Sequence, residues 1–263
     1  MEELAQQGEP KPLFEARERA VGRCMAARGW RYWPVPWRPP APEPLAQDPR
    51  HGDDVPLHRA MGYGVATALT KPPVDLNGDY VQRLSGDDPQ KYSTALFGTP
   101  RHRLDITLPD GEVTFVYTDG CTSRAKRSVY GDLRSWVLAD TVVINLPFEI
   151  ADRVRRDPRA VAADRRWSAC MAVHGYHYRT PDEAKRRFMD PDPKALRTTA
   201  AGVRRSEIAQ AVDDARCDRQ AGRARLIRVL DRHYGDRVAR ERAAQIQAYQ
   251  ELIAQAVTKV SRR

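Results

Sequence analysis

Apolar residues recur at steps of three and four over residues 13–28, LFEARERAVGRCMAAR, which predicts an amphipathic helix. Gly29 follows as a helix-ending residue, and the prolines beyond it prevent the helix from continuing. The same periodicity, broken by proline and glycine, predicts further helices, of which two are expected to begin at the capping residues Asp119 and Ser206. These helices cover residues 77–84, 88–97, 119–131, 132–157, 158–175, 180–188, 206–222 and 223–261.

A different pattern, strict alternation of apolar and polar residues, occurs in RLDITL and EVTFVYT on either side of a Pro-Asp-Gly turn. It predicts one β-hairpin at about residues 103–118. A single hairpin is marginal in water, so we expect it to lie on helices or to pair with a short strand near residues 31–36. The predicted fold is therefore α+β and predominantly α-helical, a helical bundle with a long C-terminal helix and one hairpin.

The domain organisation follows from the proline-rich stretches and the apolar stripes. We expect a flexible N-terminus over residues 1–12 and a single helical domain over 13–263, with a Pro-rich wrap at 33–58. Two sub-domains, at about 13–130 and 131–263, are the alternative. The C-terminal helix carries a coiled-coil-like apolar stripe, which packs on the other helices or, in a second interpretation, forms a homodimer.

A nine-residue segment occurs twice, as CMAARGWRY at residues 24–32 and as CMAVHGYHY at residues 170–178. Each copy places a glycine just past the end of a predicted helix, where a left-handed conformation is favoured. The aromatic residue after the glycine is then expected to fold back on the methionine, as in a Schellman cap. The predicted clasps are Met25, Gly29 and Trp30 in the first copy and Met171, Gly175 and Tyr176 in the second.

The chain has four cysteines, each at least 47 residues from the next. A four-cysteine zinc site normally contains a closely spaced pair, so no metal and no cofactor are expected. Four buried free thiols in a cytosolic protein are one interpretation. The favoured one is two disulfides, Cys24–Cys121 and Cys170–Cys217, because each helix-ending cysteine is followed by one partner in a later helix. Disulfides imply an oxidising compartment.

Charge and composition narrow the function classes. The net charge is +9, and the basic excess lies in residues 151–263, which suits either solvated helix faces or an anionic partner. No stretch of 18 apolar residues is present, so no membrane-spanning helix is predicted. The first residues, MEELAQQGEPKP, lack the basic and apolar regions of a signal peptide, so export is inferred from other features.

Catalytic signatures are missing from the sequence, which contains no P-loop, GxGxxG, HExxH or GxSxG motif. His174 and His177 are close in sequence but straddle Gly175, so we interpret them as surface or capping residues. An acid/base site assembled from distant loops remains an alternative. Its candidate residues are His58, His102, Asp105 and Asp119.

The aromatic residues of the proline-rich stretch are the candidate binding residues. Their simplest role is to fix the loop to the core, since buried aromatic rings commonly do so. The alternative role is a shelf for a sugar or a peptide. The residues of this candidate binding shelf are Trp30, Tyr32, Trp33 and Trp37.

Three segments in this order, RCMAARGW, YGDLRSWVLADTVVINLPFEIADRV and WSACMAVHGY, resemble a group of uncharacterised actinobacterial proteins. The likeness extends from about residue 13 onward. Members of that group are typically predicted to be secreted or lipid-anchored. The resemblance therefore implies export and disulfides, and it implies no particular reaction.

These observations together predict a non-catalytic extracytoplasmic protein of a bacterial envelope, either secreted or membrane-anchored. We expect it to bind an anionic cell-wall polymer, a peptide or a membrane-protein partner, with peripheral membrane contact as a further possibility. An envelope hydrolase with its site near the hairpin is one alternative. A cytosolic, arginine-rich nucleic-acid-binding protein is the other, although nucleic acid is the less favoured partner.

Overall fold

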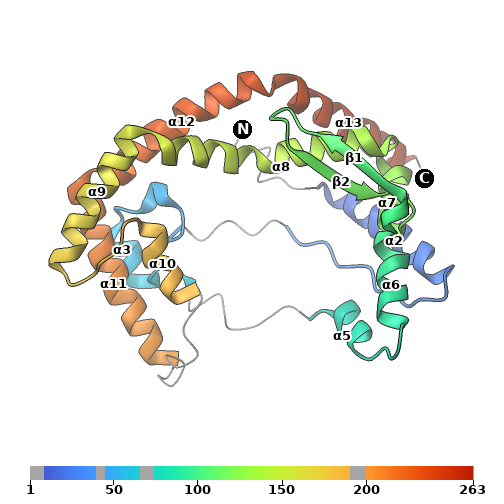
Figure 1. Ribbon diagram of the computed structural model, residues 1–263, viewed down its shortest axis with the longest axis horizontal. Helices are drawn as coiled ribbons and strands as arrows, with labels where there is room; N and C mark the ends of the chain where they lie inside the picture. Colours follow the sequence, from blue (N-terminus) through green and yellow to red (C-terminus); the bar gives the residue numbers. More distant parts are fainter. Residues whose placement is uncertain (1–8, 40–44, 66–73, 190–199, 263) are drawn as a thin grey trace. The chain divides into compact units, whose positions relative to one another are not determined.

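The computed structural model is α+β and predominantly helical (Figure 1). The described part of the chain contains eleven α-helices and one antiparallel hairpin, as the sequence predicts. None of the described helices is long and apolar enough to cross a membrane. The structure describes residues 9–39, 45–65, 74–189 and 200–262.

The chain forms two compact units whose segments alternate along the sequence. Unit 1 comprises Met1–Ala41, Val74–Pro147 and Ala239–Arg263. Unit 2 comprises Pro42–Pro73 and Phe148–Val238. The units are therefore not the sequence halves 13–130 and 131–263. The physical reason is that the last helix, α13 (Ala243–Ser261), packs on α2 (Lys11–Ala26) and α7 (Cys121–Tyr130) of unit 1.

Unit 1 begins earlier than the sequence suggests. Residues 1–8 lie outside the described residues, but Lys11 and Pro12 already belong to α2, so the expected flexible segment 1–12 is too long. Helix α2 packs most closely on α7, and α6 (Asp88–Phe97) packs on both helices. The described residues of unit 1 also form α5 (Leu76–Gln82) and the first part of α8 (Leu133–Arg156).

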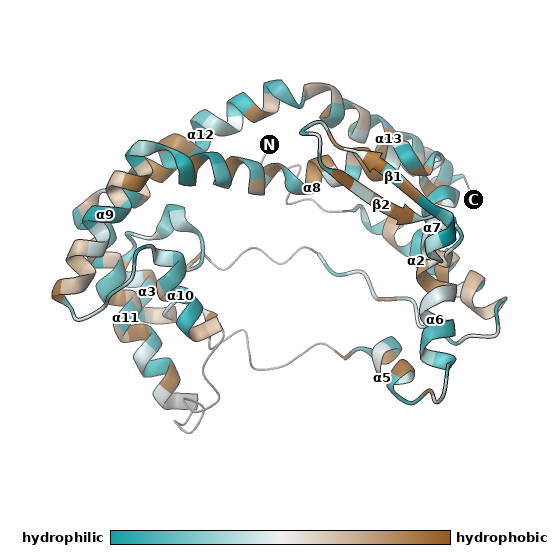
Figure 2. Ribbon diagram, in the orientation of Figure 1, coloured by the Kyte–Doolittle hydropathy of each residue, from teal (hydrophilic) through white to brown (hydrophobic). Residues whose placement is uncertain are grey.

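The hairpin of unit 1 is formed by β1 (Arg103–Thr107) and β2 (Val113–Tyr117), whose strands carry several hydrophobic residues (Figure 2). Ile106 is buried, while Phe115 on the other face is exposed. The short strand expected near residues 31–36 does not form. The Trp33 N–H donates instead to the Asn77 side chain, which in turn donates to the Trp33 carbonyl.

Unit 2 is built around α11 (Ala200–Ala221), which packs on α3 (Val55–Met61), α9 (Pro158–Val173) and α10 (Pro181–Met189). Helix α3 lies beside α11 in Figure 1. The buried face of α11 is rich in small side chains, which permits close approach. The buried small residues are Ala211, Ala215, Cys217 and Ala221.

Two predicted helix boundaries are wrong. Helix α11 starts at Ala200, so Ser206 is an exposed residue inside the helix and not its cap. The long C-terminal helix is divided at Arg242 into α12 (Arg223–Glu241) and α13. Arg242 leaves the helical region with φ −108°, and no glycine or proline marks the position in the sequence.

The C-terminal apolar stripe is partly used for packing within each unit. In unit 2, Ile227 and Leu230 of α12 are buried against Val154 and Ala160. In unit 1, the ring of Tyr249 stacks on Trp136. These contacts match the simpler of the two interpretations of the stripe, and homodimerisation through it stays a prediction.

Candidate functional site

The two copies of the nine-residue segment end two helices of the same length, α2 and α9, which have 16 residues each. Gly29 and Gly175 adopt the left-handed conformation, with φ of 81° and 83°. The N–H of Trp30 donates to the carbonyl of Met25 at 3.0 Å, and Tyr176 makes the corresponding bond to the carbonyl of Met171 at 3.0 Å. Both helix ends are therefore Schellman caps.

The aromatic residue of each cap covers the core of its own unit. Trp30 packs against a cluster that includes Met25 and Cys121, and its ring meets the edge of Tyr92. Tyr176 packs against a cluster that includes Met171. The methionine, glycine and aromatic residue thus act together as one device that ends the helix.

Each unit contains one disulfide beside its cap. Cys24 is bonded to Cys121 in unit 1, and Cys170 to Cys217 in unit 2, which is the pairing expected from the sequence. The bonds join α2 to α7 and α9 to α11. Two such disulfides are typical of proteins that fold in an oxidising compartment.

The two copies differ at the fourth residue after the cysteine, which is Arg28 in unit 1 and His174 in unit 2. Arg28 donates to the carbonyls of Ala95 and Asp119, both at 2.8 Å. It therefore ties the end of α2 to α6 and to the segment before α7. His174 is an exposed residue at the C-cap of α9, and its imidazole lies near the disulfide of unit 2.

A cavity of 390 Å³ opens beside Trp30 in unit 1. Its volume falls in the range of small-ligand sites. Two cationic side chains, one aromatic ring and several hydrogen-bonding groups line it, so it suits a ligand with both polar and flat apolar surfaces. The lining residues are Arg28, Trp30, Asp87, Gln90, Lys91, Thr94 and Ala95.

Only Trp30 of the four predicted shelf residues lines this cavity. The Tyr32 hydroxyl donates to the buried carboxylate of Glu18 at 2.8 Å. The ring of Trp33 meets the edge of Tyr80, and the indole N–H of Trp37 donates to the backbone carbonyl of Glu9 at 3.3 Å. These three aromatic residues therefore hold the proline-rich segment against unit 1.

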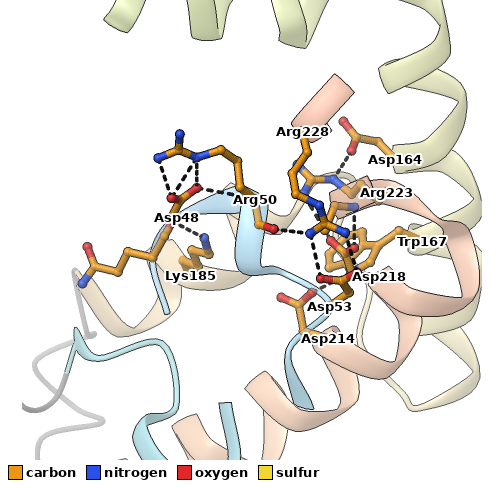
Figure 3. Close-up of polar contacts among 12 residues, drawn as sticks. Asp48, Arg50, Asp53, Asp164, Trp167, Lys185, Asp214, Asp218, Arg223 and Arg228 are labelled. Atoms are coloured by element: carbon orange, nitrogen blue, oxygen red, sulfur yellow. Dashed lines mark hydrogen bonds and ion pairs between the residues drawn. The ribbon is translucent and has the colours of Figure 1, made fainter. Parts of the chain in front are cut away.

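A buried charge network lies in unit 2 between α9, α11 and α12 (Figure 3). The carboxylate of Asp214 accepts from the Tyr63 hydroxyl at 2.8 Å and from the Trp167 indole N–H at 2.7 Å. One helical turn later, Asp218 accepts from the backbone N–H of Ala224 at 2.7 Å. Every one of these groups joins α11 to a neighbouring segment.

Arg223 is the cation of this network. Its guanidinium lies 2.6 Å from Asp164 and 3.3 Å from Asp218, and its side chain is only 10% exposed. Burial raises the pKa of Asp218 to about 6, while Arg223 and the N–H of Ala224 act in the opposite direction. Burial also raises the pKa of Asp214, against the lowering effect of its two hydrogen-bond donors.

The segment before α3 is held to α11 and α12 by further charged side chains of unit 2. Arg228 pairs with Asp53 at 3.1 Å and donates to the backbone carbonyl of Arg50 (Figure 3). Arg50 pairs with Asp48 at 2.7 Å, and Arg219 donates to the backbone carbonyl of Asp53 at 2.9 Å. These contacts anchor the 3₁₀ turn Pro49–His51, so the network has a structural role.

The residues of the predicted acid/base site are divided between the two units. His58 belongs to unit 2, whereas the other three belong to unit 1. Asp119 is not a helix cap, because Gly120 caps α7, and both carboxylate oxygens of Asp119 accept from Thr99 at 2.9 Å. Hydrogen bonds from Thr99 lower the pKa of Asp119 although burial opposes them. Asp105 pairs with Arg103 at 2.6 Å. Both aspartates are therefore engaged in local polar contacts within unit 1.

His58 is the one predicted residue that sits in a polar core. It is 3% exposed, its Nδ1 lies 3.0 Å from the Gly62 carbonyl, and its Nε2 has no hydrogen-bond partner among the described residues. His177, beyond the second cap, is exposed. Neither histidine lines the cavity beside Trp30.

Asp214, Asp218 and the role of Arg28 are not among the sequence-based predictions. The signal for the first two was the spacing of four between Asp214 and Asp218, which places both on one face of a helix. The signal for Arg28 was that the second copy of the segment carries a histidine, His174, at the same position. Comparisons with protein-family models, with curated proteins and with solved structures find no match.

Proposed function

We propose that this chain is a non-catalytic, extracytoplasmic binding protein, either secreted or membrane-anchored. Its ligand is an anionic envelope polymer, which it binds at the cavity beside Trp30. The extracytoplasmic location is supported by the two disulfides, one in each unit. The resemblance to actinobacterial proteins that are typically predicted to be secreted or lipid-anchored points the same way. The ligand is inferred from the charges and shape of the cavity.

The observation that carries the proposal is the charge of Arg28. Its hydrogen bonds go to two backbone carbonyls, and no described carboxylate lies within ion-pair distance of it. A half-buried guanidinium without an anionic partner attracts an anion more strongly than an exposed, paired one. Lys91 adds a second cation at the same cavity. The ligand group that suits these two side chains is a phosphate or carboxylate.

The rest of the lining favours a ligand that is also rich in hydroxyl groups. Trp30 presents a flat apolar surface, on which the carbon skeleton of a sugar or polyol can lie. Asp87 can accept hydrogen bonds from hydroxyl groups, and Gln90 and Thr94 can both donate and accept them. A polyol-phosphate or sugar-phosphate repeat fits this combination. A cavity of 390 Å³ has room for about one such repeat unit.

Binding of a poly(glycerol phosphate) oligomer to the full-length chain tests the proposal, measured by isothermal titration calorimetry. The variant is Lys91→Gln, which removes a cavity cation that is 62% exposed and weakly paired at 3.4 Å with Asp88. The matched control is Lys11→Gln in the same unit, where the lysine is 60% exposed and pairs at 3.9 Å with Glu15. We expect about fivefold weaker binding for Lys91→Gln and no change for Lys11→Gln.

Three results would contradict the proposal. The first is equal affinity of the two lysine variants, which would mean that only the net charge attracts the polymer. The second is equal binding of a single-stranded DNA oligomer of the same charge, which would favour the nucleic-acid alternative. The third is no binding by the wild type at low salt.

The compartment is tested separately. We expect the chain isolated from an oxidising compartment, without reductant, to have a mass four hydrogen atoms below that of the fully reduced chain. Native protein with four titratable thiols would contradict the extracytoplasmic location and leave the cavity test unaffected.

A further inference from the structure

The two disulfide sulfurs of unit 2 and one imidazole form a cluster at the end of α9. Cys170 and His174 are four residues apart and share one face of the helix end. Cys217 approaches from α11 through the disulfide. One ligand atom from each of these three residues lies within 4.8 Å of the other two.

We propose that unit 2, when this disulfide is reduced, binds a thiophilic divalent cation such as Zn²⁺ through Cys170, Cys217 and His174. A dithiol reductant supplies two electrons and two protons, which convert the disulfide into two thiols and the reductant into its own disulfide; a phosphine supplies the two electrons and becomes its oxide, while water supplies the oxygen and the two protons. The cation then displaces both thiol protons and is held by two thiolates and one neutral imidazole nitrogen. This inference does not rest on the proposed polymer binding.

The geometry needs only a small adjustment. Zinc binds thiolate at about 2.3 Å and imidazole at about 2.0 Å, so two sulfurs on one tetrahedral ion lie about 3.8 Å apart. The Cα atoms of Cys170 and Cys217 are 5.5 Å apart, and breaking the sulfur–sulfur bond frees both side chains to separate. Gln220 Oε1 lies 3.3 Å from the Sγ of Cys170, so this oxygen or a water completes four-coordination.

Access to the cluster is open from one side. His174 is exposed and Cys170 half-buried, so a reductant and a cation can approach. Cys217 is buried, which places its sulfur below the surface of the unit. A partly buried site of this kind suits a soft cation, because thiolate sulfur holds zinc in preference to magnesium or calcium.

Unit 1 supplies a natural comparison. Its copy of the segment has the same cysteine, Cys24, bonded to Cys121, but the fourth residue after it is Arg28. A guanidinium is always protonated and has no lone pair for a metal. The proposal therefore assigns the cation to unit 2 alone. The sequence does not predict this site, because its two cysteines are widely spaced in the chain and lie on different helices. The third ligand is a histidine.

The test uses the full-length chain, reduced under argon with a phosphine that is then removed, and titrated with Co²⁺ as a spectroscopic probe. We expect thiolate-to-cobalt charge-transfer absorption that saturates at one equivalent and is abolished by Zn²⁺. The double variant Cys24→Ser with Cys121→Ser should keep this absorption. His174→Arg, which places at this position the residue that the first copy carries, should weaken Co²⁺ binding roughly tenfold or more. His177→Arg is the matched control and should leave it unchanged.

Each contrary outcome overturns the proposal. The first is charge-transfer absorption that saturates only at two equivalents of Co²⁺. The second is loss of this absorption in the Cys24/Cys121 double variant. Another is equal affinity of His174→Arg and wild type. Far-UV circular dichroism follows folding throughout. If reduction unfolds unit 2, the proposal requires Co²⁺ to restore the helical signal, and failure to restore it is also contrary.

Discussion

Units 1 and 2 use the same nine-residue segment, with the same Schellman cap and a disulfide from the same cysteine, yet they differ in the chemistry that surrounds it. In unit 1, the fourth residue after the cysteine is an arginine that bridges two carbonyls beside a cavity. In unit 2, it is an exposed histidine beside the sulfurs. The comparison teaches that the same helix end serves as a scaffold in both units, while the residue at this position makes different contacts in each.

The units also differ in the partners of the carboxylate that lies six residues before the cysteine. Glu18 in unit 1 is 4% exposed and accepts from the Tyr32 hydroxyl and the Val35 N–H, both within its own N-terminal segment. Asp164 in unit 2 pairs instead with Arg223 of α12. The first arrangement fixes a loop next to its own helix. The second joins helices that are far apart in the sequence, so unit 2 depends more on buried charge.

Removing each disulfide in turn tests whether the two bonds contribute equally to the free energy of unfolding. We expect these variants to show the largest effects. Serine replacements of Cys24 with Cys121, and of Cys170 with Cys217, open loops with sequence separations of 97 and 47 residues. The chain-entropy model gives losses of about 5 and about 4 kcal/mol in the free energy of unfolding. Urea unfolding followed by circular dichroism measures both.

The order of these two losses is the informative part. A larger loss for the unit 2 pair would mean that the buried charge network depends on the disulfide beyond its effect on the unfolded chain. An unchanged free energy of unfolding in either double variant would show that the bond is absent from the native protein.

The buried charge of unit 2 predicts a pH dependence. Since the pKa of Asp218 is raised to about 6 in the folded chain, the folded state binds its proton more tightly than the unfolded state. Its stabilising contribution is therefore complete below the unfolded pKa near 4 and is lost as the pH rises through 6. Relative to Asp218→Asn, the wild type should lose about 2 kcal/mol of unfolding free energy between pH 4 and pH 7.

Parallel stability curves for wild type and Asp218→Asn over this range would refute the raised pKa. The comparison uses the change with pH and not the stability at one pH, because the asparagine also removes one of the two ion-pair partners of Arg223. The asparagine side chain can still accept from the N–H of Ala224. Unfolding is measured with urea, which is uncharged, at constant ionic strength, so that the screening of the remaining charges is the same in every sample.

Exchanging the variable residue should affect the two units unequally. Arg28→His removes two hydrogen bonds to half-buried carbonyls, so we expect a loss of about 1 to 2 kcal/mol in unfolding free energy and weaker polymer binding. His174→Arg changes an exposed side chain and should alter stability by less than about 0.5 kcal/mol. Equal stability losses would mean that Arg28 has no bridging role.

Much of this fold could be predicted from the sequence, because its strongest signals are local. Glycine after the periodic stretch located both Schellman caps, and alternation on either side of Pro-Asp-Gly located the hairpin. The break at Arg242 could not be predicted, since no local residue demands it. The division into units escaped for the same reason, because it depends on α13 packing against helices more than 100 residues earlier.

The candidate sites were less predictable than the fold. Aromatic composition pointed to four shelf residues, but only Trp30 is free to line a cavity, and the others are engaged by partners such as Glu18 and Tyr80. Which aromatic residue stays available depends on contacts from distant segments. The acidic residues of α11 likewise look like a solvated face until the neighbouring helices are in place.

The smallest expected effect is that of replacing the two cap glycines. It tests whether the two caps contribute equally to the free energy of unfolding. Gly29 and Gly175 have φ of 81° and 83°, and a Cβ added at either position would meet no atom within 4 Å. Replacement by alanine therefore costs only the left-handed backbone conformation, about 1 kcal/mol, and the cost should be the same in both units. Unfolding free energies of Gly29→Ala and Gly175→Ala, measured side by side, check this equality. A difference above about 0.5 kcal/mol would mean that the caps are not equivalent, and the shared segment would then no longer be a single scaffold used twice.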